Sequence, residues 1–123
     1  MIPPTITDQE HRVGVRKGKP FFYDHAELKE AKQKLEAHFA RFAPERPLQG
    51  PLMLIVKWCF PCPKSQSPGY KFTKPDGGNL NKALDDVMTK LGFWEDDAQI
   101  ASETVEKFWV DDKFGIYVKV SEL

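Results

Sequence analysis

The clearest pattern in the chain is a stripe of apolar residues in its second half, at the spacing of one helical face. Its members fall three or four positions apart: Leu80, Ala83, Leu84, Val87, Met88 and Leu91. Such spacing predicts a helix that buries this face against a core. We expect Asn79 to cap its start, and Gly92 predicts its end, since glycine readily adopts the backbone conformation that follows a helix.

A second helix is predicted in the first half of the chain, from Asp24 to about Phe42. Asp24 and Glu27 have the spacing of a capping box, which marks a helix start. The helix should end before Pro44, because the residue that precedes a proline disfavours helical angles. Its apolar stripe consists of Leu28, Ala31, Leu35, Phe39 and Phe42.

The remaining apolar segments are short and predict strands. Residues 52–60 open with a continuous apolar run, which indicates a central strand buried on both faces. Residues 61–69 are expected to form a long loop and residues 70–73 a short strand. Residues 104–110 and 114–120 predict two strands joined in a hairpin. The order of elements predicts an α/β (α+β) fold, with a small mixed sheet and two main helices in a single domain of residues 1–123.

Composition fits a folded domain, because 41% of the 123 residues are hydrophobic and 29% are charged. No apolar run approaches the roughly eighteen residues of a membrane span, and the N-terminus lacks the pattern of a secretory signal, so we expect a cytoplasmic protein. The net charge of zero hides an asymmetry: residues 1–74 carry 13 basic and 7 acidic side chains (+6), and residues 75–123 carry 5 and 11 (−6). This separation favours a basic part for a polyanion and an acidic part for a metal. Alternatively, the two halves neutralise each other in the fold.

Basic residues gather at about residues 11–22, a segment that we expect to be a flexible loop or arm. Together with lysines of the first helix and one lysine before the second, they are candidates for contacts to a phosphate backbone. Such contacts give affinity with a steep salt dependence and little sequence information. The candidates are Arg12, Arg16, Lys17, Lys19, Lys29, Lys32, Lys34 and Lys74.

The two cysteines, Cys59 and Cys62, form a single C-x-x-C pair. Without a second pair or nearby histidines, this spacing favours two partly buried thiols. A zinc site shared across a dimer is the alternative.

Polar residues that could take part in catalysis or ligand binding lie at the start of the second predicted helix. Asp76 precedes it, and Gly77 and Gly78 let the backbone approach a ligand closely. Lys82 lies on the first turn, off the apolar stripe, where the free N–H groups of a helix start attract anions such as phosphate.

Two further carboxylates, Asp96 and Asp97, follow the helix. They come back to it only if the chain reverses at Gly92 and runs along the helix, with Phe93 and Trp94 packed against it. Adjacent side chains of an extended segment point in opposite directions, so we expect only one of the two aspartates to face the site.

Carboxylates at both ends of a helix, with a lysine on its first turn, predict a divalent metal held against a phosphodiester. Helix caps and solvated turns are the alternative explanation for such aspartates, and the one we expect for Asp85 and Asp86.

The second half of the chain combines Lys74-Pro75-Asp76, Asn79-Leu80, Lys82, Gly92-Phe93-Trp94, Asp96-Asp97-Ala98-Gln99 and Lys107. With these residues, the stretch from about Tyr70 to Val120 resembles the RusA family of Holliday-junction resolvases, many of which prophages carry. The resemblance implies a homodimeric endonuclease that depends on Mg²⁺, with Mn²⁺ as an alternative metal. Its implied substrate is a four-way junction in branched DNA, which it cuts in paired strands during recombination and repair.

The resemblance also implies roles for residues. Asp76, Asp97 and Lys82 match the catalytic positions, and Asp76, Asp97 and Asp96 are the expected metal ligands. The family motif Asp-x-Asp-Asn has its second aspartate at the position of Gly78. This glycine is equally compatible with a natural loss in a prophage gene and with an introduced change.

Mg²⁺ usually binds one or two protein carboxylates together with water and phosphate oxygens, so Asp76 and Asp97 are expected to keep a weakened site. Asp96 or Glu103 would compensate for the missing ligand. The alternative is a non-catalytic junction-binding homologue. A third interpretation is a small protein-interaction domain, which an absence of salt-dependent binding to branched DNA would favour.

Overall fold

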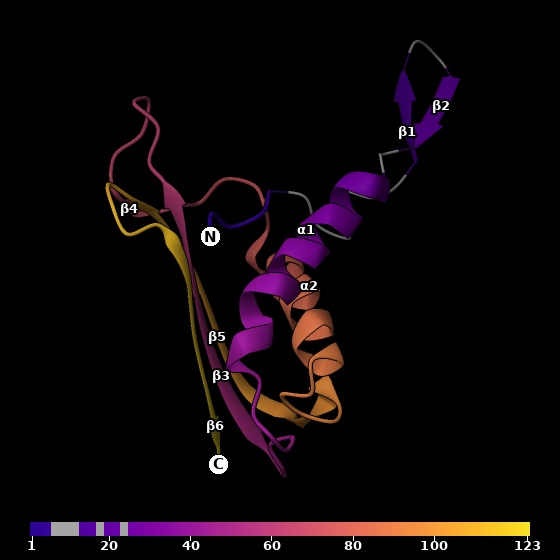
Figure 1. The fold of residues 1–123 in the computed structure, drawn as a ribbon. Helices are drawn as coiled ribbons and strands as arrows, with labels where there is room; N and C mark the ends of the chain where they lie inside the picture. The colour runs from indigo at the N-terminus through magenta and orange to yellow at the C-terminus, as the bar shows by residue number, and fades with distance from the viewer. Residues whose placement is uncertain (6–12, 17–18, 23–24) are drawn as a thin grey trace.

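The computed structural model describes residues 1–5, 13–16, 19–22 and 25–123, and shows a mixed sheet with two helices on one of its faces (Figure 1). The helices are α1 (His25–Phe39) and α2 (Gly77–Lys90), and the short 3-10 helices are η2 (Ala40–Phe42) and η3 (Asp97–Gln99). The main sheet contains β3 (Leu52–Pro61), β4 (Gly69–Tyr70), β5 (Ile100–Val110) and β6 (Gly115–Glu122). The predicted α+β fold with a small mixed sheet and two main helices is confirmed.

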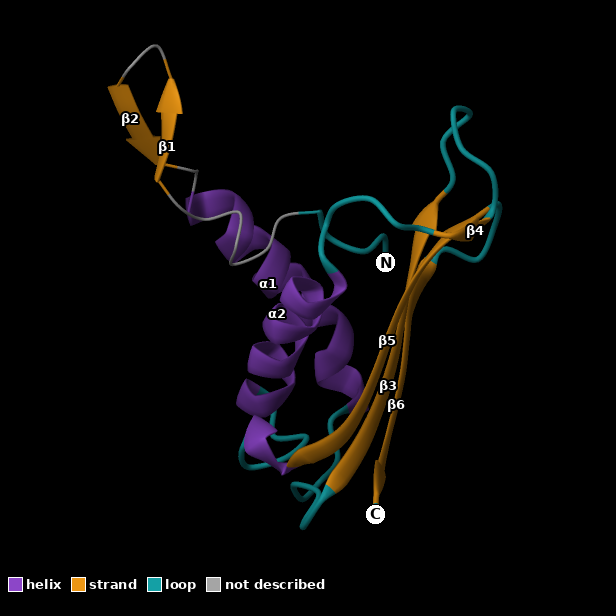
Figure 2. Cartoon of the chain, turned by 180° about the vertical axis from the view of Figure 1, so that it is seen from behind, coloured by secondary structure: helices purple, strands orange, loops and turns teal. Residues whose placement is uncertain are grey.

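A separate antiparallel pair is formed by β1 (Val13–Arg16) and β2 (Lys19–Phe22). It lies beyond the N-terminal end of α1, away from the main sheet (Figure 2). The sequence predicts an irregular loop here, and for these eight residues that prediction is wrong. The valines of the first strand and the phenylalanines of the second favour extended backbone, a signal that the surrounding basic residues obscure. Asp24, the predicted start of the first helix, lies outside the described residues.

The strand order of the main sheet is β4-β5-β3-β6. β3 pairs in parallel with β5 and antiparallel with β6, so it separates the last two strands of the chain. The predicted hairpin between those two strands is therefore wrong. Both edges of the apolar strand β3 gain a hydrogen-bonded neighbour in this order, which a hairpin beside it would not provide.

The core lies between the helices and one face of β3. Alternate residues of β3 are buried, whereas those between them are partly exposed. The prediction of a strand buried on both faces is wrong, because both helices pack on the same face of the sheet (Figure 2). The buried side chains of β3 are Leu52, Leu54, Val56, Trp58 and Phe60, and those of the predicted stripe of α2 are Leu80, Ala83, Leu84, Val87 and Met88.

The predicted stripe of α1 is buried only in part. Leu35 and Phe39 belong to the core, but Phe42 is 59% exposed. The α-helix ends at Phe39, and the 3-10 turn that follows has a different angular spacing, which carries Phe42 off the buried face.

A buried hydrogen bond joins the sheet to α2. The indole Nε1–H of Trp58 donates to Oδ1 of Asn81 at 2.7 Å, and both residues are no more than 1% exposed. The same amide donates through Nδ2 to Oε1 of Glu103 on β5 at 2.9 Å. Asn81 therefore binds two strands at once and sets the position of α2 on the sheet.

Cys59 and Cys62 are free and partly buried, in line with the sequence interpretation. Burial raises the pKa of the Cys59 thiol. Within the described ranges, no helix combines the length and the apolar character needed to cross a membrane.

We predict that Asn81→Leu lowers the free energy of unfolding by about 1–3 kcal/mol, because the Trp58 N–H is left buried without an acceptor. Trp58→Phe leaves the Asn81 carbonyl equally unpaired. The double variant should cost less than the sum of the two, since it orphans neither group. Urea denaturation of the four proteins measures this coupling.

Gln33→Leu, at an exposed position of α1, serves as the control and should change the unfolding free energy by less than about 0.5 kcal/mol. Strictly additive effects of the two core substitutions would show that the buried hydrogen bond contributes no coupling.

Candidate functional site

Asp76 is the N-cap of α2. Its carboxylate accepts the backbone N–H of Asn79, with an N···O distance of 3.2 Å. The helix therefore begins at Gly77, and the predicted cap at Asn79 is wrong, because the carboxylate of Asp76 already satisfies the free N–H group of the third residue. A Cβ at Gly77 would lie 3.1 Å from a methyl carbon of Val105, so glycine allows the first turn to pack closely on β5.

Two lysines hold the loop that precedes α2. Lys71 is only 5% exposed, and its ammonium donates to the carbonyl oxygen (3.0 Å) and the hydroxyl (2.8 Å) of Thr73 and to the carbonyl of Lys74. Lys107 on β5 donates to the carbonyls of Thr73 and Pro75, at 2.7 Å each. Burial and the charge of Lys107 lower the pKa of Lys71. The family motif includes Lys107, whereas no pattern in the sequence marks Lys71.

The aspartates of the η3 turn have different environments. Asp96 caps the turn by accepting the N–H of Ala98 at 2.9 Å, and the side chain of Gln99 accepts the N–H of Asp96 at 3.1 Å. Partial burial, a hydrogen bond with Asp96 and the nearby carboxylates of Asp86 and Glu103 raise the pKa of Asp97. Of the two aspartates, Asp97 is therefore the one that lies among other carboxylates.

Asp85 also lies among these carboxylates, contrary to the prediction of a helix cap or solvated turn. The side chain is partly buried, and its Oδ1 has no hydrogen-bond partner among the described residues. Burial, followed by the charges of Glu103, Asp97 and Asp86, raises the pKa of Asp85 to about 7. Asp86 is exposed as expected and makes an ion pair with Lys32 at 3.3 Å. Sequence reasoning misses Asp85 because its burial depends on the chain that returns after α2.

The carboxylates form a row along α2. Glu103 on β5 lies beside the second turn of α2, where it accepts a hydrogen bond from Asn81. Asp97 in η3 lies near Asp85, which is on the third turn of α2. Asp76 precedes Asp85 by nine residues, which corresponds to about 13 Å along the helix axis. Within the described ranges, no group of three or more His, Cys, Asp or Glu side chains is arranged to hold a metal ion. One chain therefore brings Asp97 together with Asp96 and Asp85, but not with Asp76.

Position 78 and Lys82 lie on the first turns of the same helix. A Cβ at Gly78 would lie 3.1 Å from Oδ1 of Asp76, so an aspartate here would place a second carboxylate directly beside the first. Lys82 is exposed and makes no ion pair within the part of the chain that the structure describes. Its place between Asp76 and Asp85 leaves its ammonium available to an anion along the row.

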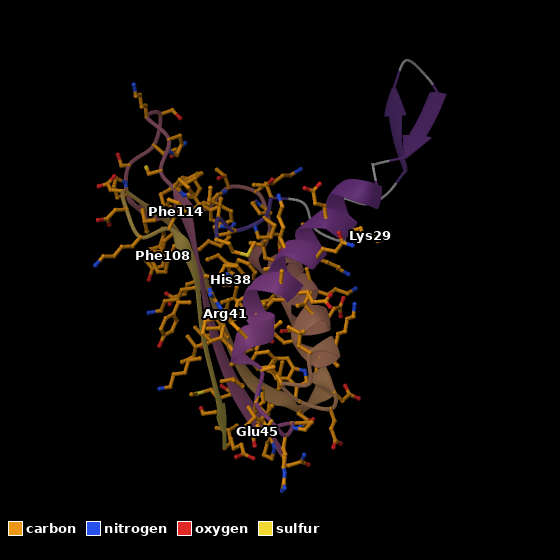
Figure 3. All side chains as sticks on the ribbon, in the orientation of Figure 1. Lys29, His38, Arg41, Glu45, Phe108 and Phe114 are labelled. Carbon is orange, nitrogen blue, oxygen red and sulfur yellow. The ribbon has the colours of Figure 1, made fainter. Side chains whose placement is uncertain are left out.

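The predicted phosphate contacts are spread over several elements. Lys29, near the N-terminal end of α1, is exposed (Figure 3), as are Lys34 and Lys74. Lys34 also pairs with Glu30 at 3.4 Å. Arg16 and Lys19 stand opposite each other at the end of β1 and the start of β2. Arg12 and Lys17 lie outside the described residues.

In metal-free buffer, we predict that Asp85→Asn raises the free energy of unfolding at pH 8 by about 1–2 kcal/mol, a figure reduced for the partial exposure of the side chain. A carboxyl group whose pKa is about 7 in the fold, against an ordinary 3.8, stays protonated in the fold while it ionises in the unfolded chain. The stability of the unmodified protein should therefore fall as the pH rises from about 4 to about 7.

Urea denaturation across this pH range measures the effect, and the fall should be smaller in Asp85→Asn. Asp111→Asn, in an exposed turn, should keep the full pH dependence. An identical pH profile for Asp85→Asn and the unmodified protein would contradict the raised pKa.

The sequence matches the family model described as Endodeoxyribonuclease RusA over residues 2–121. It is 31% identical over 113 residues to the uncharacterized protein YqaN of Bacillus subtilis (strain 168), a match that covers 82% of this chain and 79% of that protein. It is also 31% identical over 120 residues to the crossover junction endodeoxyribonuclease rusA of Lactococcus phage r1t, covering 95% of this chain and 89% of the phage protein. These matches include the N-terminal half, and the chain belongs to the RusA family of endodeoxyribonucleases.

Proposed function

We propose that this protein is a metal-dependent endonuclease that resolves four-way (Holliday) junctions in recombination and repair. The observation that carries the proposal is the charge interaction between Asp97 and Asp85 beside α2, in a chain that belongs to the RusA family of endodeoxyribonucleases. The phage relative is a crossover junction endodeoxyribonuclease, which supports a branched substrate.

The proposed cofactor is Mg²⁺, with Mn²⁺ as an alternative. Mg²⁺ usually takes one or two protein carboxylates and completes its shell with water and phosphate oxygens. Asp97 together with Asp85 or Glu103 would supply such ligands. Asp85 supports this proposal, because its oxygen without a hydrogen-bond partner in the described part of the chain lies among other carboxylates, where a cation would be stabilising. Asp96, also a predicted ligand, is already engaged as the cap of η3. The bound ion would supply Lewis-acid chemistry at the phosphate.

The chain's own residues would position the DNA and handle charge. Lys82 would bind the scissile phosphate and stabilise the negative charge that develops on it. In the metal-free protein Asp85 has a pKa of about 7, and a bound cation would favour its ionised form. Lys74 and the basic residues of β1, β2 and α1 would contact the phosphate backbone, which gives salt-dependent affinity.

A homodimer would join Asp76 to this centre. Within one chain Asp76 and Asp97 stand apart along α2, so a shared metal site needs Asp76 of one copy beside Asp97 of another. A two-fold dimer with two such sites also matches the symmetry of a four-way junction.

We predict that Asp76→Asn and Asp97→Asn each reduce Mg²⁺-dependent cleavage of a synthetic four-way junction by at least about 100-fold, because each removes a metal ligand. Their affinity for the junction should change little. When the two variants are mixed, cleavage should return in part, since one site of a mixed dimer then combines an intact Asp76 with an intact Asp97. Gel analysis should show that these mixed dimers cut one strand of each junction.

Glu95→Gln, at the exposed residue before the aspartate pair, is the control and should cleave normally. Failure to recover cleavage after verified subunit exchange would place the whole site within one chain. Undiminished cleavage by Asp97→Asn would refute the proposed catalytic centre.

The alternative function is junction binding without cleavage, and Gly78 is the observation that favours it. Restoration of the aspartate separates the two, because it adds a carboxylate beside Asp76 without altering the basic residues. We predict that Gly78→Asp raises Mg²⁺-dependent cleavage at least about tenfold, the lower end of the losses seen when metal sites are impaired. Junction affinity should stay within about twofold, a change of roughly 0.4 kcal/mol.

Gly78→Ala is the matched control, because it adds the same Cβ close to Asp76 without a carboxylate. It should not gain activity. If the unmodified chain is inert and Gly78→Asp is active, the binding function is correct for this sequence. If the unmodified chain cuts and Asp97→Asn stops it, the enzymatic function is correct.

A further inference from the structure

Phe72 is a large apolar side chain that stands in solvent. It is 89% exposed, more than any other large hydrophobic residue that the structure describes. No aromatic ring in the described part of the chain stacks on it. It lies in the loop between β4 and α2, two residues before the exposed Lys74 and four before Asp76.

The backbone on both sides of Phe72 is fixed. The N–H of Lys71 donates to the carbonyl of Lys107 at 2.9 Å, which attaches the loop to β5. On the other side, the ammonium groups of Lys71 and Lys107 both bind the carbonyl of Thr73, at 3.0 and 2.7 Å. With residues 71 and 73 held by the sheet, Phe72 is presented outward by a rigid support.

Lys71, which holds this loop, is itself buried against the core. The ammonium of Lys71 lies 5.1 Å from the ring centre of Phe60 and 4.6 Å from that of Trp109, in cation–π geometry. Burial of a charged lysine is costly unless it is paired or well hydrogen-bonded. The ammonium of Lys71 is hydrogen-bonded to Thr73 and Lys74, which holds the backbone that follows Phe72.

An exposed aromatic ring beside a lysine is the combination by which proteins bind unpaired bases, with stacking on the ring and attraction of the phosphate. In an intact duplex both faces of each base are already stacked on neighbours. Where the arms of an opened junction meet, the stack of each arm ends, and its last base offers a face on which a protein ring can stack.

We propose that Phe72 stacks on a base exposed at the branch point and thereby determines the preference for branched over duplex DNA. This inference rests on the proposed junction function and adds to it the residue that recognises the branch. Lys74 would hold the adjoining phosphate, while Asp76 stands at the start of α2 in the same loop.

The test compares Phe72→Ala and Phe72→Trp with the unmodified protein, in binding to a four-way junction and to a duplex of the same sequence. Phe72→Ala should weaken junction binding about 5–150-fold, as expected for the loss of one stacked base, and leave duplex binding unchanged. Phe72→Trp should keep the preference. Phe42→Ala removes another exposed phenylalanine ring, 59% exposed at η2, and should change neither affinity.

A second measurement reports the contact itself. In junctions with 2-aminopurine at the branch, the unmodified protein and Phe72→Trp should change the fluorescence of the probe, whereas Phe72→Ala should not. Equal junction preference and equal fluorescence change in Phe72→Ala would overturn the inference.

A loss of dimer mass in Phe72→Ala, seen by analytical ultracentrifugation, would also overturn it, because the ring would then pack on a second copy of the chain. If the unmodified protein binds no branched DNA, the proposed function fails and the inference fails with it. Binding without cleavage removes only the enzymatic part of the proposed function and leaves Phe72 testable.

Discussion

The hydrogen bond between the indole of Trp58 and the amide of Asn81 is the constraint on which the rest of the structure depends. Both groups are buried, where a hydrogen bond is stronger and an unpaired polar group costs more than at the surface. The bond admits one register of α2, because a shift by one residue would rotate the helix by about 100° and break it. The same amide also donates to Glu103, so the packing of the core sets the position of the carboxylate row relative to α2.

Local pattern predicts the helical part of the fold well and the sheet less well. The stripe of α2 is buried as its spacing requires, and β3 begins where its apolar run begins. The order of strands depends on pairing between residues far apart in the sequence, which no local pattern encodes. A hairpin is the natural prediction for two strands joined by a short link, yet β3 takes the place between them because it would otherwise keep an unpaired edge.

In the candidate site, too, the sequence predicts some residues, whereas others become apparent only in the folded structure. The motif identifies Asp76, Lys82 and Asp97, because their residue types and spacing can be recognised in the sequence alone. It does not identify Asp85 or Lys71, whose environments arise only when the chain packs back on itself. Asp85 resembles any polar residue of a helix until the η3 turn and β5 bring carboxylates to it, and Lys71 resembles a surface lysine until two aromatic rings enclose it.

The central place of β3 has a consequence for the newly made chain. Leu52 pairs with Ile100 on one side and with Glu122 on the other, so its neighbours come 48 and 70 residues later in the sequence. Contacts of such long range slow folding, since a large loop must close before any of them forms. While the last strands are still being synthesised, an apolar strand with two open edges is free to pair with other chains. Aggregation is therefore a hazard of synthesis for this topology more than of the finished protein.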